Sequence, residues 1–134
     1  MFEKVEHIGI AVKNISASIE LFEALLGAPC YKKENVETEK VTTAFFRTGE
    51  TKIELLESIS SDSAIAKFVE KRGEGIHHIA FEVEDIEREM IRLKGKGFHL
   101  LSEKPLRGAD NKMVCFIHPK SCSGVLIELC QEIK

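Results

Sequence analysis

An approximate internal repeat is the feature of this sequence that most constrains how it can fold. The segment "HIGIAV" begins at His7, and the similar segment "HIAFEV" begins 71 positions later, at His78. In each segment every second residue is bulky and apolar, which is typical of a β-strand. Each is followed by a short polar turn and then by apolar residues at helical spacing. The repeat predicts two similar units, each built from strands and a helix.

The two halves also end alike. The strand-like segments "KVTTAFFRTG" and "KMVCFIHP" are followed by "KIELLE" and "VLIELC", which share the triplet Ile-Glu-Leu. Between the halves, "SSDSAIAKFVEKRGEG" has the pattern of a short amphipathic helix. We therefore predict an α+β fold of two βαβββ modules within a single domain of residues 1–134. The predicted limits are about 4–58 for the first module, about 61–72 for the helical connector and about 75–131 for the second module.

The alternation in the first strand of each half indicates which way the histidines point. His7 shares one face of its strand with the small residues Gly9 and Ala11, while bulky residues occupy the other face. His78 has the corresponding position in the second half. The bulky faces suit packing under the helices, so we expect both histidines on the opposite faces. His77 precedes His78 and must point the other way, toward a helix or the rim, where we expect a structural role.

A glutamate lies in the middle of the last strand of each half. Glu54 and Glu128 each stand between an isoleucine and a leucine. A buried carboxylate is costly unless it is paired, protonated or bound to a metal. If the halves pack pseudo-symmetrically, the two glutamates and the two histidines converge. The pattern thus favours one shared metal site with the ligands His7, Glu54, His78 and Glu128.

The composition argues against several classes of protein. The net charge of −3 supplies no excess of positive charge for nucleic acid or anionic lipid. No apolar run approaches the roughly 18–20 residues that cross a bilayer, and the first residues do not resemble a secretory signal. The four cysteines form no C-x-x-C pair. We expect a cytoplasmic protein with four reduced, structural cysteines and with neither a nucleic-acid nor a membrane partner.

Four segments carry a resemblance to a known family: "HIGIAVKNI", "TKIELLE", "GEGIHHIAFEVEDI" and "HPKSCSGVLIEL". They are similar to the vicinal oxygen chelate superfamily and, within it, to the methylmalonyl-CoA epimerase family, over roughly Val5 to Leu129. The resemblance implies two βαβββ modules that form a curved mixed sheet around a metal cavity. It also implies the metal ligands His7, Glu54, His78 and Glu128.

The resemblance further implies a reaction, the metal-dependent interconversion of (2R)- and (2S)-methylmalonyl-CoA. A C2 proton would be removed and returned through a metal-stabilised enolate. A set of two nitrogen and two oxygen ligands leaves open positions on six-coordinate Co, Mn, Ni or Mg, whereas tetrahedral Zn fits less well. Its partners would be an acyl-CoA substrate and a second copy of the chain in a homodimer.

The resemblance identifies the first acid–base residue directly but leaves the second one open. Glu128 resembles a late glutamate to which the family assigns both metal contact and proton transfer. Some relatives carry a second glutamate around the position of Thr43, and threonine cannot act as a carboxylate base. Glu54, or a route through water, would then take that role.

The CoA phosphates need cationic or backbone donors. The loops around the last hairpin offer Arg107, Lys112 and Lys120, each of which could equally be a solvated surface charge.

Three other functions are compatible with this fold. A glyoxalase I-like lactoylglutathione lyase would use the same fold and metal, although the second-half segments look more like the epimerases. A non-catalytic small-molecule-binding protein typically lacks the four ligands. A dioxygenase uses two histidines and one carboxylate around iron and needs the position that a fourth ligand would fill.

Overall fold

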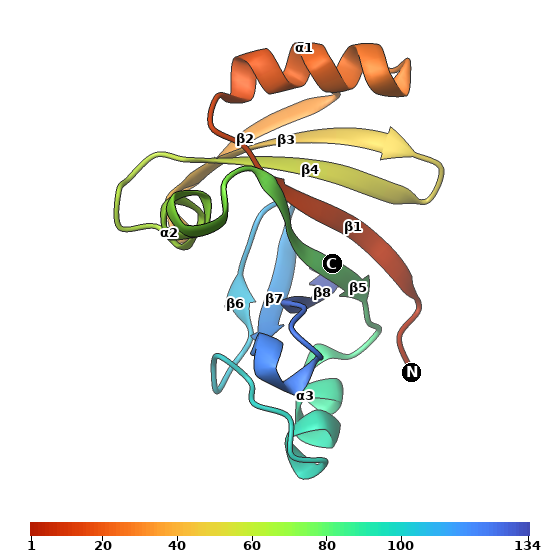
Figure 1. Ribbon diagram of the computed structural model, residues 1–134. Helices are drawn as coiled ribbons and strands as arrows, with labels where there is room; N and C mark the ends of the chain where they lie inside the picture. The colour runs from red at the N-terminus through yellow and green to blue at the C-terminus, as the bar shows by residue number, and fades with distance from the viewer. The chain divides into compact units, whose positions relative to one another are not determined.

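The computed structural model describes all residues 1–134, and its elements follow the order expected from the repeat. The predicted α+β fold with two βαβββ modules is confirmed. The first module contains β1 (Lys4–Ala11), α1 (Ile15–Leu26), β2 (Lys32–Val36), β3 (Val41–Thr48) and β4 (Thr51–Ser58), followed by the connector α2 (Ala64–Arg72) (Figure 1). The second contains β5 (Gly75–Glu82), α3 (Ile86–Gly95), β6 (Leu106–Arg107), β7 (Lys112–Ile117), a 3-10 turn (Pro119–Ser121) and β8 (Ile127–Glu132).

By internal packing the chain divides into two compact units. The N-terminal unit comprises His7–His77, and the C-terminal unit comprises His78–Lys134 together with Met1–Glu6. β1 therefore begins in one unit and continues in the other. The expectation of a single domain with the module limits given above stays a prediction.

The sheet of the N-terminal unit has the strand order β2-β3-β4-β1. β1 runs parallel to β4, and β3 is antiparallel to both of its neighbours. α1 covers one face of this sheet (Figure 1), and its Phe22 ring lies 6.2 Å from the ring of Phe46 on β3. Asn14 caps the start of α1 by accepting a hydrogen bond from the Ala17 backbone N–H, and Gly27 ends the helix with a φ of 67°. One face of the sheet is thus buried by apolar contacts with α1.

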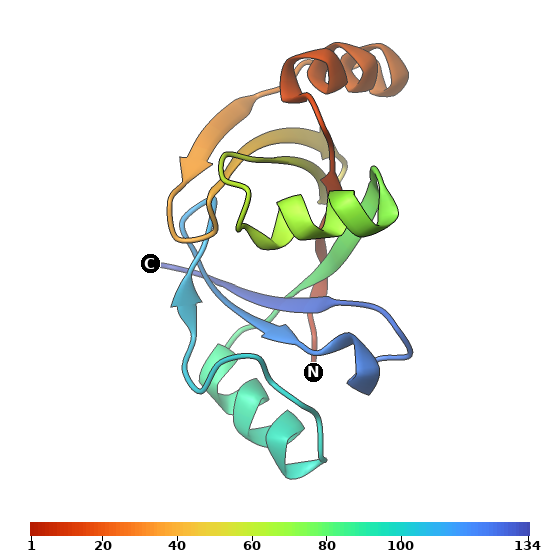
Figure 2. The ribbon, with the colours of Figure 1, turned by 60° about the vertical axis from the view of Figure 1, so that its left-hand side comes forward.

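The connector α2 packs against β4 (Figure 2). Ser63 caps its first turn by accepting a hydrogen bond from the Ala66 N–H at 3.0 Å. Ile65 is its buried apolar residue.

The sheet of the C-terminal unit has the order β5-β8-β7-β6, with β5 parallel to β8 and β7 antiparallel to both of its neighbours. α3 packs on β7 and β8 and buries Met90 and Leu93 against them. The first residues of the chain complete this unit. Phe2 joins the apolar cluster and lies 5.1 Å from the ring of Phe81, and the Glu3 N–H donates to the Glu82 carbonyl.

All four cysteines are free thiols, as predicted. No helix of the chain has both the length and the apolar character needed to cross a bilayer.

Glu89 on α3 gives the fold a dependence on pH. The Arg92 guanidinium donates two hydrogen bonds to Glu89 Oε1, at 3.2 and 3.0 Å, and holds the pKa of this buried carboxyl below its ordinary 4.5. A depressed carboxyl pKa stabilises the fold above the unfolded pKa, and the stabilisation is lost as pH falls through the folded pKa. We expect Glu89→Gln to lower the free energy of unfolding at neutral pH by about 0.5 kcal/mol.

Urea unfolding at neutral pH and at about pH 3 measures this effect. The difference between wild type and Glu89→Gln should shrink at the lower pH, because the wild-type carboxyl is then increasingly protonated. The matched control is Glu87→Gln, in the same first turn of α3 but without an ion pair. A difference that stays constant with pH would contradict the prediction.

Candidate active site

The first candidate pair lies on the face of the N-terminal sheet opposite α1. We call the face of each sheet opposite its own helix, α1 or α3, the helix-free face. Gly9 on β1 is the register partner of Glu54 on β4, while Ile53 and Leu55 belong to the cluster under α1. Because Gly9 has no side chain, the Glu54 carboxylate has room to reach along β1. Its Oε1 lies 3.2 Å from Nε2 of His7, and both residues are buried.

The helix-free face of the C-terminal sheet carries an equivalent pair. Ala80 on β5 is the register partner of Glu128 on β8. Glu128 Oε1 lies 3.0 Å from Nε2 of His78, and only 2% of His78 and 6% of Glu128 is exposed. The edge of the His78 ring also meets the ring of Phe116, with 5.8 Å between centroids.

The two pairs are built on the same plan. In each unit the histidine precedes by two residues a glycine or alanine, whose partner on the parallel neighbouring strand is the glutamate. The repeat in the sequence is thus a repeat of local geometry. Each pair offers one imidazole nitrogen and one carboxylate oxygen, which are ligand types for Co, Mn and Ni. Each pair therefore offers donor atoms of the types that suit a divalent metal ion.

The His77 side chain points toward helix α2. Its ring meets Phe68 of α2 edge-on, with 5.0 Å between centroids and an interplanar angle of 87°. This agrees with the expectation that His77 faces a helix.

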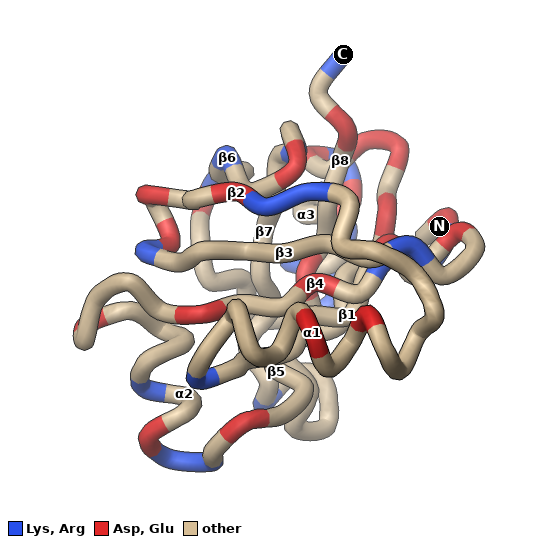
Figure 3. The backbone as a smooth tube through the Cα atoms, turned by 90° about the horizontal axis from the view of Figure 1, so that it is seen from above, with Lys and Arg blue, Asp and Glu red and all other residues tan.

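β3 supplies no acid–base residue to the helix-free face. Thr43 is fully buried, and its hydroxyl donates to the Glu34 carbonyl at 3.3 Å. β3 carries no acidic residue, and no red segment lies along it in Figure 3. Glu54 is the one buried carboxylate of the N-terminal unit.

The three predicted phosphate-binding residues have different surroundings. Arg107 and Lys112 were expected in loops, but they lie in β6 and β7, because the antiparallel pairing extends the hairpin to them. Arg107 is exposed and donates to Asn111 Oδ1 at 3.0 Å, whereas Lys112 is only 8% exposed. Lys120 is exposed in the 3-10 turn.

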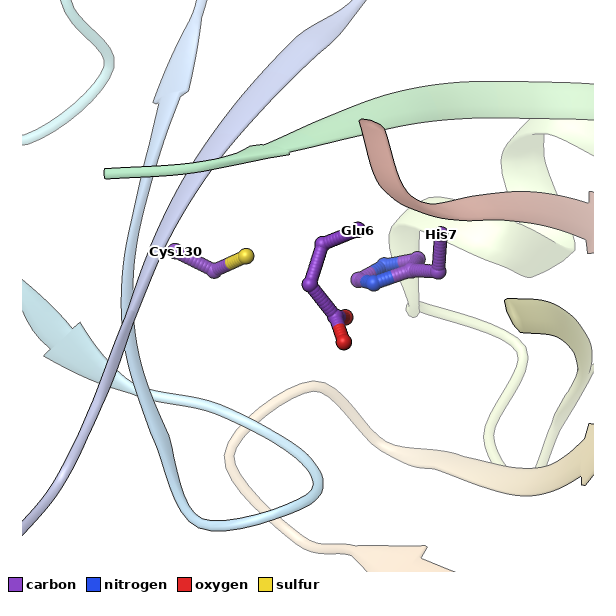
Figure 4. A group of neighbouring side chains, drawn as sticks. All are labelled: Glu6, His7 and Cys130. Carbon is purple, nitrogen blue, oxygen red and sulfur yellow. The ribbon is translucent and has the colours of Figure 1, made fainter. Parts of the chain in front are cut away.

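Sequence reasoning missed one further buried polar side chain of the C-terminal unit, that of Glu6. Glu6 is 3% exposed, and the thiol of Cys130 points toward it in Figure 4. Glu6 could not be singled out, because an acidic residue in a strand is usually solvated. The only available signal was its position next to His7 in the first strand.

Cys115 and Cys122 have no features of nucleophiles. Burial raises the pKa of the Cys115 thiol and of the Cys122 thiol, so both stay protonated at neutral pH. Only a thiolate is a strong nucleophile, and the expected structural role of these residues is consistent with this.

Comparison with known proteins gives the family. The model of the Glyoxalase/Bleomycin resistance protein/Dioxygenase superfamily matches residues 6–116. Ethylmalonyl-CoA/methylmalonyl-CoA epimerase of Cereibacter sphaeroides is 41% identical, in an alignment that covers 98% of this chain and 99% of the relative. Human mitochondrial methylmalonyl-CoA epimerase is 38% identical, over 96% of this chain and 73% of the human protein.

A solved structure agrees with these relatives. A variant of Streptomyces coelicolor methylmalonyl-CoA epimerase in complex with 2-nitronate-propionyl-CoA has a TM-score of 0.96, with 34% identity over 100% of both chains. The chain therefore belongs to the methylmalonyl-CoA epimerase family, within the glyoxalase, bleomycin resistance protein and dioxygenase superfamily.

Proposed function

We propose that this protein is a metal-dependent epimerase that interconverts (2R)- and (2S)-methylmalonyl-CoA. The observation that carries the proposal is the buried histidine–glutamate pair that recurs, in the same register, on the helix-free face of each unit. The full-length similarity to an ethylmalonyl-CoA/methylmalonyl-CoA epimerase supports the substrate class.

One divalent ion would be held by His7, Glu54, His78 and Glu128. Each of these side chains is buried and of a type that binds metals. When bound, a divalent ion supplies Lewis acidity that makes the C2 proton of the thioester more acidic. Two nitrogen and two oxygen ligands favour Co, Mn, Ni or Mg over tetrahedral Zn.

The glutamates would carry the proton. Epimerisation needs a base on one face of C2 and an acid on the other. We assign proton removal on one face to Glu128 and proton return on the opposite face to Glu54, the one buried carboxylate of its unit. Because one glutamate removes the C2 proton and the other delivers a different proton, solvent deuterium enters C2 once the glutamates exchange with water between turnovers.

Four finer features belong to the same proposal. Arg107, Lys112 and Lys120 are proposed to contact the anionic part of the acyl-CoA. The native metal is proposed to be cobalt. The protein is proposed to act as a homodimer and to work in the cytoplasm.

A proton NMR time course in deuterated water tests the reaction. We expect (2R)- or (2S)-methylmalonyl-CoA to lose its C2 proton signal in the presence of the protein. A chelator should suppress the loss, and added Co²⁺ should restore it. An unchanged C2 signal with the metal-loaded protein, alongside turnover of methylglyoxal and glutathione, would replace the epimerase by a lactoylglutathione lyase.

The adjacent histidines provide a matched pair of variants. We expect His78→Ala to lower metal affinity by more than about tenfold, with a parallel loss of activity, because a ligand is removed. His77→Ala removes a ring that packs against Phe68 of α2, and it should leave both nearly unchanged. Bound metal is measured by elemental analysis after dialysis, and activity by C2 exchange. Equal losses in the two variants would contradict the assignment of His78.

Glu128→Gln separates metal binding from proton transfer. The amide oxygen can still act as a ligand, but the amide cannot accept the C2 proton. We expect part of the metal to be retained and C2 exchange to fall by at least about 100-fold. Glu132→Gln, on the same strand and exposed, is the control. Exchange at the wild-type rate in Glu128→Gln would remove this residue from proton transfer.

A further inference from the structure

The N-terminal unit carries an exposed arginine held on an aromatic platform. The Arg47 guanidinium lies 4.1 Å from the ring centroid of Tyr31, and this ring lies 6.2 Å from that of the buried Phe45. An arginine stacked on a ring uses the face of its guanidinium, so the N–H donors at its edge remain available to an anion.

Arg47 lies on the same face of the sheet as the His7–Glu54 pair. Along β3, Ala44 and Phe46 belong to the cluster under α1, so Phe45 and Arg47 point to the helix-free side. The register places Phe45 beside Glu54 and places Arg47, Lys52 and His7 in one row across β3, β4 and β1.

The Arg47 side chain forms no ion pair, and basic residues of β2 lie nearby. Lys32, also beside Phe45, is paired with Glu34 at 3.5 Å. Arg47 has only the contact with Tyr31. Figure 3 shows the basic stretch of β2 next to β3. An exposed guanidinium in such a position attracts phosphate groups and can bind them with two hydrogen bonds.

The spacing suits a CoA thioester. Neighbouring strands lie about 4.8 Å apart, so the backbones at His7 and Arg47 are about 10 Å apart, and the Arg47 side chain extends farther toward Tyr31. The pantetheine arm between the thioester and the phosphates is as long as four to five extended residues, about 15 Å. A thioester held at His7 and Glu54 would therefore bring its phosphates within reach of Arg47.

We infer that Arg47, positioned by the ring of Tyr31, binds the phosphates of the acyl-CoA substrate. This inference rests on the proposed function, because it takes the acyl group to lie at the His7–Glu54 pair. Arg47 contributes to substrate binding and not to proton transfer. Its removal should therefore change KM and leave kcat unchanged.

A comparison of two substrates tests the inference. Methylmalonyl-CoA carries the phosphates, whereas methylmalonyl-pantetheine has the same acyl group and arm without them. We expect Arg47→Ala to raise KM for methylmalonyl-CoA about tenfold, as loss of one charge-assisted contact would, and to leave KM for methylmalonyl-pantetheine unchanged. Equal KM values for wild type and Arg47→Ala with methylmalonyl-CoA would overturn it, as would equal losses with the two substrates.

Arg72→Ala is the matched control, because the Arg72 guanidinium also lies over an aromatic ring, that of Phe68 on α2, at 5.7 Å. It removes the same charge from the same unit and should not affect either KM. Two variants of Tyr31 test whether its ring positions Arg47. Tyr31→Leu should reproduce the KM pattern of Arg47→Ala, whereas Tyr31→Phe should retain wild-type behaviour. Loss of kcat with both substrates in Tyr31→Leu would refute its positioning role.

Calorimetric titration with free CoA gives a readout that is independent of turnover. We expect Arg47→Ala to weaken CoA binding about tenfold relative to wild type and to Arg72→Ala. Unchanged CoA affinity in Arg47→Ala would overturn the inference. If wild type bound CoA through Arg47 but left the C2 proton of methylmalonyl-CoA in place, the proposed epimerisation would fail and the phosphate site would stand.

Discussion

The contact between a buried carboxylate and an imidazole is the interaction on which the rest of this molecule depends. A carboxylate placed in the middle of a strand, away from water, destabilises the fold unless a partner compensates its charge. In each unit the partner is a histidine two residues from a glycine or alanine on the adjacent parallel strand. The fold commits one face of each sheet to apolar packing under a helix, and this leaves the other face for the pair. Stability and chemistry are thereby assigned to opposite faces of the same strands.

The helix-free faces differ in what surrounds each pair, even though the pairs themselves repeat. His78 is packed against Phe116 in the C-terminal unit. In the N-terminal unit the aromatic neighbour of Glu54 is Phe45. The ring of Tyr31 lies beside that of Phe45, and the Arg47 guanidinium lies over the ring of Tyr31. The two copies of the motif are thus set in different aromatic surroundings.

Much of the fold could be predicted from the sequence, because strand alternation and helical spacing are local properties. The faces of His7 and His78 and the central positions of Glu54 and Glu128 follow from a period of two. Features that depend on neighbours distant in the chain could not be predicted. The burial of Lys112 depends on how β7 is covered, and the stacking of Arg47 on Tyr31 depends on the register between β2 and β3. The burial of Glu6 also depends on residues that are distant in the chain.

Because Met1–Glu6 belong to the C-terminal unit, a fragment that holds only the second half of the sequence would be incomplete. The duplicated segments in the sequence have their border near the connector, whereas the packing units meet within β1. A fragment that began at His78 would contain the whole second copy of the motif, but it would lack Phe2 and the backbone bond from Glu3. Such a fragment would have to obtain these contacts from another molecule, whereas the intact chain supplies them in cis.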